Sequence, residues 1–379
     1  MKIFSAFILI VFTSVCMNAN CQNIVLTDAK ATKETVCLYH NLKKIADEKT
    51  YLFGHQDDLA YGVNWRYKER KSDVMESCGD YPALYGWDLG RIENADTNNI
   101  DGVPFRKMKK YIQDAYNRGG VITISWHMNS PLGNSKSAWD TTHGTLATLL
   151  PSGTNHELFK TWLNNAAVFL SSLKGKNGEA IPVIFRPFHE QSGNWFWWCR
   201  NACSEQEFKI VWRYIVYYLR NEKQLHNLIF NYNVSDIKSK EDFYTYYPGN
   251  DVVDMVSFDN YQNSTTENDR NWFIQETNRR LDILDVVAAE THKIPALAET
   301  GLEAIPDSTW WTNTLTKAIG NHAIAYILLW RNHGYNEYMK KMHYYVPYEG
   351  QISKNDFIKY YGLPQTLFQK EVAVLKVYE

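Results

Sequence analysis

Short apolar runs recur along the chain and alternate with longer segments in which apolar residues return at helical spacing. The runs are rich in Val, Ile, Leu, Phe and Tyr and show little strict alternation of apolar and polar positions. This pattern is typical of strands buried on both faces, as in a parallel sheet. The eight runs are Thr50–His55, Pro82–Trp87, Gly120–His127, Ile181–Phe188, Leu228–Asn233, Val253–Asp259, Ile294–Glu299 and Ala323–Trp330.

Amphipathic segments lie between these runs, and no Gly/Ser-rich or Pro-rich linker interrupts the series. Eight strands separated by helices predict an α/β fold, a single-domain (β/α)8 TIM barrel, and 379 residues suit its size. A doubly wound open sheet is the structural alternative, but no Gly-x-Gly-x-x-Gly motif follows the first strand. The predicted helices include Phe105–Arg118, Leu158–Lys174, Glu205–Glu222, Trp272–His292 and Thr309–Asn321.

The first 21 residues have the features of a secretion signal peptide. Lys2 supplies a positive charge, the segment from Ile3 to Val15 is almost all apolar, and small or polar residues follow. We expect residues 1–21 to be this signal, residues 22–379 to be the barrel domain, and the location to be periplasmic or secreted. Cys16 and Cys21 leave a lipid anchor open. The apolar segment is too short to span a membrane comfortably, so we expect no transmembrane segment.

The charge and aromatic content narrow the range of partners. A formal net charge of −2 argues against a nucleic-acid partner, which requires many cationic contacts. The chain holds 13 Trp, 25 Tyr and 17 Phe. Flat rings stack on the apolar faces of sugars and bases, but they also fill protein cores, so composition alone leaves both interpretations open.

Four cysteines remain after the predicted signal peptide, an even number in a chain with an export signal. The spacing of Cys199 and Cys203 suits a local disulfide, which leaves Cys37 and Cys78 as another possible pair. Zinc binding is the alternative, but no Cys-x-x-Cys spacing supports it.

Polar and aromatic side chains follow all eight predicted strands. The active site of a (β/α)8 barrel lies at the carboxyl ends of its strands, so these side chains predict a lined cleft. They are His55, Gln56 and Asp57; Trp87 and Asp88; Trp126, His127 and Asn129; Arg186, His189 and Glu190; Asn231 and Asn233; Asp259, Asn260 and Tyr261; Glu299; and Trp330 and Arg331.

Two glutamates in this set carry the clearest chemistry. Glu190 follows the fourth predicted strand and Glu299 ends the seventh. These strands face each other across a barrel mouth, where two carboxylates about 5 Å apart are the equipment of a retaining glycosidase. A single glutamate after an apolar run often caps a helix or pairs with an arginine, so the argument depends on the pair.

The surroundings of the two glutamates predict different roles. Glu190 precedes the ring-rich loop Gly193-Asn-Trp-Phe-Trp-Trp198, which would desolvate its carboxyl group and favour the protonated form of a general acid. Glu299 would be the ionised nucleophile, with Tyr261 donating a hydrogen bond to it. Metal-dependent hydrolysis through His127 and His189 is the alternative. The first strand, however, ends in His55-Gln-Asp-Asp rather than His-x-His, and we expect neither a metal nor a cofactor.

The motif Arg186-Pro-Phe-His-Glu190, followed by Gly-Asn-Trp-Phe-Trp-Trp, resembles the family 26 glycoside hydrolases, chiefly β-mannanases. Further matches cover nearly the whole mature chain: Phe53-Gly-His-Gln-Asp-Asp, Ser125-Trp-His127-Met-Asn, Ser257-Phe-Asp-Asn-Tyr261, Ala298-Glu299-Thr-Gly and Trp330-Arg331-Asn. The resemblance implies a catalytic domain over residues 22–379, with Glu190 as acid/base and Glu299 as nucleophile.

Seven further site residues are implied by the same resemblance. His189 and Tyr261 would hydrogen-bond near the nucleophile, and Trp195 would stack the first sugar on the leaving-group side. Trp330 would form the platform under the cleaved sugar. The glycone side of the cleft would be lined by His127, Asp88 and Arg331. The Asn- and Asp-rich segment 91–105 is a candidate for a loop specific to this chain.

These residues lead us to expect a retaining endo-β-1,4-mannanase that acts as a monomer on mannan, galactomannan or glucomannan. Exo-like release of mannobiose remains open if a loop closes the glycone end of the cleft. The same mechanism on β-glucan or xylan is a further alternative, since the family includes such enzymes. A non-catalytic glycan-binding protein is disfavoured because both glutamates are present.

Overall fold

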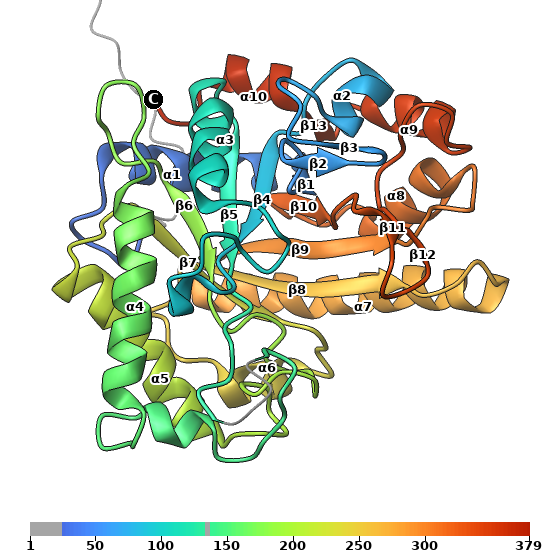
Figure 1. Cartoon of the computed structure of the whole chain (residues 1–379). Coiled ribbons are helices and arrows are strands. Elements are labelled where there is room, and N and C mark those ends of the chain that lie inside the picture. The colour runs from blue at the N-terminus through green and yellow to red at the C-terminus, as the bar shows by residue number, and fades with distance from the viewer. Residues whose placement is uncertain (1–24, 133–136) are drawn as a thin grey trace, which may run out of the picture.

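Eight parallel strands close into a barrel at the positions of the eight apolar runs, which confirms the predicted (β/α)8 fold (Figure 1). The structure is a computed structural model that describes residues 25–132 and 137–379. The strands pair in chain order, and β10 pairs with β1 from Leu52↔Tyr326 to His55↔Leu329 to complete the ring. The strands are β1 (Tyr51–Gln56), β4 (Leu84–Asp88), β5 (Val121–Ser125), β6 (Val183–Arg186), β7 (Leu228–Val234), β8 (Met255–Gln262), β9 (Ile294–Leu302) and β10 (Tyr326–Leu329).

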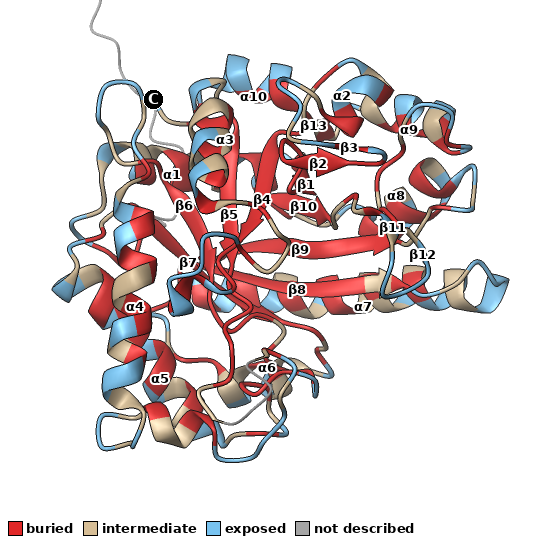
Figure 2. Cartoon of the chain, viewed as in Figure 1, coloured by how far each residue is buried: buried red, intermediate tan, exposed pale blue. Residues whose placement is uncertain are grey.

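Helices surround the barrel and bury only their inward faces, whereas the strands are buried along almost their whole length (Figure 2). Side-chain caps fix several helix starts: Ser204 and Glu207 form a capping box on α5, and Thr266 caps α7. The α-helices are α1 (Lys33–Asp47), α2 (Asp73–Cys78), α3 (Phe105–Asn117), α4 (His156–Ser171), α5 (Glu205–Tyr217), α6 (Lys240–Tyr246), α7 (Glu267–Thr291), α8 (Thr316–Ile319), α9 (Lys354–Tyr361) and α10 (Gln369–Leu375). Short 3-10 turns cover Ile92–Asn94 and Leu146–Leu149, and π-helical turns cover Tyr218–Glu222 and Trp311–Leu315.

Helix α1, which the sequence analysis did not include, packs against the barrel interior. Its Leu38, Leu42 and Ile45 belong to one buried cluster with inward-facing strand residues such as Leu84 and Ile184. The hydroxyl of Tyr39 donates to the carbonyl of Asp254, just before β8, at 2.9 Å. Because Asp254 precedes its strand, α1 closes the end of the barrel opposite the mouth.

Two short hairpins rise from the mouth of the barrel. They are β2 (Tyr61–Gly62) with β3 (Trp65–Arg66), and β11 (Gly334–Asn336) with β12 (Lys341–His343). A guanidinium nitrogen of Arg66 lies 3.2 Å from Nε2 of His333, so the two hairpins touch. A further short strand, β13 (Thr366–Leu367), pairs with the start of β1.

The disulfide expected from the spacing of Cys199 and Cys203 is wrong, as is the alternative pair of Cys37 with Cys78. All four cysteines within the described residues are free. The Sγ of Cys199 points to the carbonyl of Glu190, and the Sγ of Cys203 points back to the carbonyls of Trp198 and Cys199, each at 3.4 Å. Each thiol therefore bonds to backbone oxygen rather than to the other sulfur.

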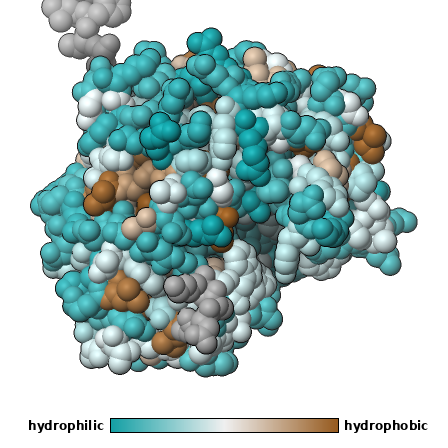
Figure 3. Space-filling model, viewed as in Figure 1, coloured by the Kyte–Doolittle hydropathy of each residue, from teal (hydrophilic) through white to brown (hydrophobic). Residues whose placement is uncertain are grey.

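Within the described ranges, no helix is both long and apolar enough to cross a bilayer. The face in Figure 3 is mostly hydrophilic, with separate hydrophobic patches. The predicted signal peptide, residues 1–21, and the anchor candidates Cys16 and Cys21 lie outside the described residues.

Candidate active site

A cleft of about 470 Å³ lies at the mouth of the barrel, between segments that follow β5, β6, β8, β9 and β10. Both glutamates singled out in the sequence line it, as do four of the other predicted site residues. Those four are His127, Trp195, Tyr261 and Trp330. The cleft therefore gathers residues that are up to 218 positions apart in the chain, from His127 to Tyr345.

Glu190 and Glu299 face each other across this cleft. One carboxylate oxygen of each and one oxygen of Asp259 lie within 4.8 Å of one another. Such a separation matches the spacing of about 5 Å that retaining glycosidases use, and it leaves less room than the 6.5 Å or more of inverting enzymes.

The backbone around Glu190 is held in an unusual conformation. Phe188 and Glu190 have φ angles of 51° and 54°, in the left-handed region that residues other than glycine seldom adopt. The amide of Glu190 donates to Oδ1 of Asn233 at 2.8 Å, and Nε1 of Trp195 donates to its Oε2 at 2.7 Å. Main-chain and side-chain contacts thus fix the direction of this carboxyl group.

Burial and the neighbouring Glu299 raise the pKa of Glu190 to about 7, while the hydrogen bond from Trp195 opposes part of that increase. A carboxyl group with this pKa carries its proton in weakly acidic solution and can release it near neutrality. These are the properties of a general acid that later serves as a base.

Glu299 is buried and accepts a hydrogen bond on each carboxylate oxygen. Nη2 of Arg186 donates to Oε1 at 2.7 Å, and the hydroxyl of Tyr261 donates to Oε2 at 3.0 Å. The contact with Tyr261 was predicted from the sequence, whereas Arg186 was predicted only to line the cleft. Arg186 is the last residue of β6 and supplies a buried positive charge to Glu299.

Asp259 is a third buried carboxyl group at this point. A register shift between β8 and β9 pairs Asp259 with Glu299, and Nη1 of Arg186 lies 3.6 Å from its Oδ2. Burial and the Glu299 charge raise the pKa of Asp259 well above its usual value. Three carboxyl groups so close together could bind a cation, but the Arg186 guanidinium already contacts two of them.

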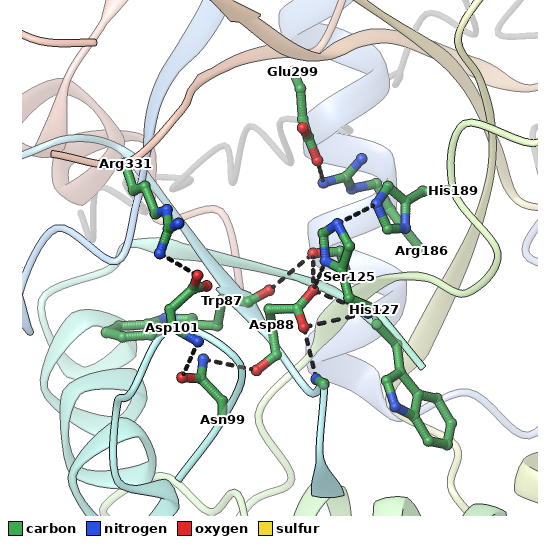
Figure 4. A network of polar contacts seen from close by, with 12 residues as sticks. Trp87, Asp88, Asn99, Asp101, Ser125, His127, Arg186, His189, Glu299 and Arg331 are labelled. Carbon is green, nitrogen blue, oxygen red and sulfur yellow. Dashed lines mark hydrogen bonds and ion pairs between the residues drawn. The ribbon is translucent and has the colours of Figure 1, made fainter. Parts of the chain in front are cut away.

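Asp88, His127 and His189 form a buried chain that reaches the cleft at His127 (Figure 4). Nδ1 of His127 lies 2.8 Å from Oδ2 of Asp88, and its Nε2 lies 3.2 Å from Nε2 of His189. Burial lowers the pKa of His127, but the charge and hydrogen bond of Asp88, together with the charges of Glu299 and Asp101, raise it above its usual value. Burial and the His127 charge lower the pKa of His189 well below its usual value, so His127 holds a proton more tightly than His189 does.

Three predicted site residues lie beside the cleft without lining it. Asp88 is fully buried beneath His127, and His189 contacts His127 rather than Glu299. The guanidinium of Arg331 donates to the carboxylate of Asp101, in the Asn- and Asp-rich loop after β4 (Figure 4). That loop, noted in the sequence as distinctive, thus contacts the segment that follows β10.

A parallel (β/α)8 barrel with two carboxyl groups facing each other at its mouth is typical of glycoside hydrolases. The model of glycosyl hydrolase family 26 matches residues 27–345, and the chain belongs to this family.

Similar proteins of known sequence are mannan endo-1,4-β-mannosidases. One from Bifidobacterium adolescentis is 30% identical over 333 residues, which cover 83% of this chain and 33% of that protein. One from Bacillus subtilis is 28% identical over 223 residues, which cover 55% of this chain and 57% of that protein. The match thus spans a third to somewhat over half of these relatives.

Solved structures match over almost the whole chain. A GH26 β-mannanase from Bacteroides ovatus superimposes with a TM-score of 0.86 at 40% identity, covering 92% of this chain and 98% of that one. The catalytic domain of a GH26 endo-β-1,4-mannanase from Bacillus sp. JAMB-750 gives a TM-score of 0.84 at 28% identity, covering 94% and 97%.

Proposed function

We propose that this protein is a retaining endo-β-1,4-mannanase that uses Glu190 and Glu299 in a double displacement. The observation that carries the proposal is the close approach of two carboxyl groups with opposite surroundings. Glu190 has a pKa raised to about 7, whereas Glu299 accepts hydrogen bonds from Arg186 and Tyr261. One group is suited to hold a proton and the other to attack as an anion.

In the first step, a carboxylate oxygen of Glu299 attacks the anomeric carbon as the glycosidic bond breaks. Glu190 gives its proton to the departing oxygen, so the leaving chain departs with a hydroxyl group. In the second step, Glu190 takes a proton from water, and the water oxygen displaces Glu299 from the anomeric carbon. Two inversions give a product with the original anomeric configuration.

The neighbouring residues would support this chemistry from fixed positions. Tyr261 and Arg186 orient Glu299, and Trp195 orients Glu190 while it offers a ring to the first leaving sugar. Trp330 is suited to form the platform under the cleaved sugar, and His127 to line the glycone side. Asp88 and His189 would act through His127, because they contact it and not the open cleft.

Support for mannan as the substrate comes from the relatives, which are named mannan endo-1,4-β-mannosidases. A product time course on linear mannan, galactomannan and β-glucan tests this assignment. The proposal expects a ladder of manno-oligosaccharides from the two mannans. Cleavage of β-glucan alone would contradict the substrate, and mannobiose as the sole early product would contradict endo action.

Variants at the two glutamates test their roles. Glu299→Ala should abolish turnover of every substrate. Glu190→Ala should lose activity on mannan. On aryl mannosides whose leaving groups need no proton it should largely retain kcat/KM, which reports the first step, while kcat falls because the base for water is gone. Glu241→Ala, at an exposed position on α6, is the matched control and should behave as the wild type. Equal losses of Glu190→Ala on both kinds of substrate would contradict its role as the acid.

A further inference from the structure

The tryptophans divide sharply by exposure. Nine of the 13 are buried, and the other four line hollows at the mouth of the barrel. Trp139 and Trp330 line the cleft, and Trp195 lines both the cleft and a second hollow. Trp272, on α7, is 42% exposed and lines only the second hollow. The four tryptophans that are not buried are therefore the ones that line these two hollows.

The second hollow, of about 620 Å³, adjoins the cleft. The two share Glu190, Trp195, Tyr261 and Asn263. Segments that follow β6, β7 and β8 form the second hollow together with α7, and it includes no residue of β9, β10 or their loops. It therefore extends from Glu190 and Trp195 away from Trp330. Its volume lies in the range of small-molecule sites.

Contacts along α7 and before it fix the part of the helix that carries Trp272. Trp272, Glu276 and Arg280 are spaced at i, i+4 and i+8, so they share one side of the helix. Arg280 contacts Glu276 at 2.9 Å and also donates to the carbonyl of Ser235 at 2.5 Å, which ties this side of α7 to the loop after β7. Asp269 accepts from the amide of Asn263 at 3.0 Å, which fixes the segment before the helix.

We propose that this second hollow binds the leaving end of the mannan chain beyond the first leaving sugar, with Trp272 as its stacking platform. The inference rests on the proposed function: a general acid at Glu190 stands on the leaving-group side, so sugars beyond Trp195 enter this hollow. An exposed ring on a fixed helix suits the apolar face of a neutral hexose. Asn194, Asn263 and Asp236, which also line the hollow, offer polar groups to sugar hydroxyls.

The test compares Trp272→Ala and Trp272→Phe on two substrates of different reach. Mannohexaose extends past Trp195, whereas the nitrophenyl group of an aryl β-mannobioside ends at the first leaving position. Trp272→Ala should lower kcat/KM on mannohexaose by about three- to tenfold, with partial recovery in Trp272→Phe. On the aryl substrate both variants should stay within about twofold of the wild type. Tyr217→Ala removes a ring that is 51% exposed on α5, outside both hollows, and should leave both substrates unaffected.

Three results would overturn the inference. Wild-type rates of Trp272→Ala on mannohexaose would show that the ring contacts no sugar. An equal loss on both substrates would indicate a general defect rather than a distal subsite. If the wild type cleaves the aryl mannobioside but neither mannohexaose nor mannan, the proposed function falls and this inference with it.

Discussion

Glu190→Gln should stabilise the folded protein above neutral pH, although it removes a proposed catalytic group. Glu190 has a pKa of about 7 in the folded state and an ordinary value of 4.5. The folded chain therefore holds this proton more tightly than the unfolded chain. Stability from this group is fully present below pH 4.5 and is lost as the pH rises through about 7. A neutral glutamine cannot lose a proton, so the variant avoids this loss.

The size of the effect follows from the two pKa values. Their difference corresponds to at most about 3 kcal/mol, since each pKa unit is worth about 1.4 kcal/mol. Because Glu190 is half-buried and faces an open cleft, solvent screening reduces this to about 1–2 kcal/mol. The amide oxygen of Gln can still accept the bond from Trp195, so packing is conserved.

Urea unfolding of the wild type and of Glu190→Gln at pH 4.5, 6 and 8 measures the difference. The variant should be more stable by about 1–2 kcal/mol at pH 8, and its advantage should shrink steadily toward pH 4.5. Glu69→Gln, at an exposed glutamate, is the control and should show no such trend. An advantage of Glu190→Gln that is independent of pH, or absent at pH 8, would refute the reasoning.

Three further predictions concern neighbouring groups. Trp195→Phe removes the hydrogen-bond donor that lowers the pKa of Glu190. The alkaline limb of the profile of kcat/KM against pH should therefore move to higher pH by about half to one unit. A limb that stays in place or moves to lower pH would contradict this. Arg186→Met leaves Glu299 and Asp259 buried without their cation. It should eliminate activity and lower the free energy of unfolding, measured in urea, by about 3–5 kcal/mol. Wild-type stability would argue against the ion pairs. Burial raises the pKa of Cys78, Cys199 and Cys203 to about 12, so these thiols should react slowly in the native mature protein at pH 8. Four thiols should titrate after denaturation without reductant. A count of two thiols or none would show that disulfides are present.

The barrel was predictable because its strands are buried on both faces and read as continuous apolar runs. Helix α1 was missed because its role depends on a distant contact, the bond from Tyr39 to the carbonyl of Asp254. The hairpins at the mouth have strands of two or three residues, too short to leave a period in the sequence.

The two glutamates were also predictable, because strand counting alone places them on opposite sides of the mouth. The contact between Arg186 and Glu299 was not, since it joins residues 113 positions apart and follows from closure of the barrel. The position of Asp259 beside Glu299 depends on a register shift, which periodicity does not encode. Arg331 was placed in the cleft by its position after the eighth strand and by resemblance, but the loop that carries Asp101 binds its guanidinium.

The central claim is that Glu299 forms a covalent bond to the sugar while Glu190 transfers the proton. Incubation with a 2-deoxy-2-fluoro-β-mannobiosyl fluoride, followed by proteolysis and mass spectrometry, tests this claim directly. The activated fluoride leaves without help from an acid, and the fluorine slows release, so the intermediate accumulates. The account predicts one fluoromannobiosyl group per chain, attached to Glu299 and absent from Glu299→Gln. A label on Glu190 or Asp259, or no label on an enzyme that cleaves mannan, would contradict it.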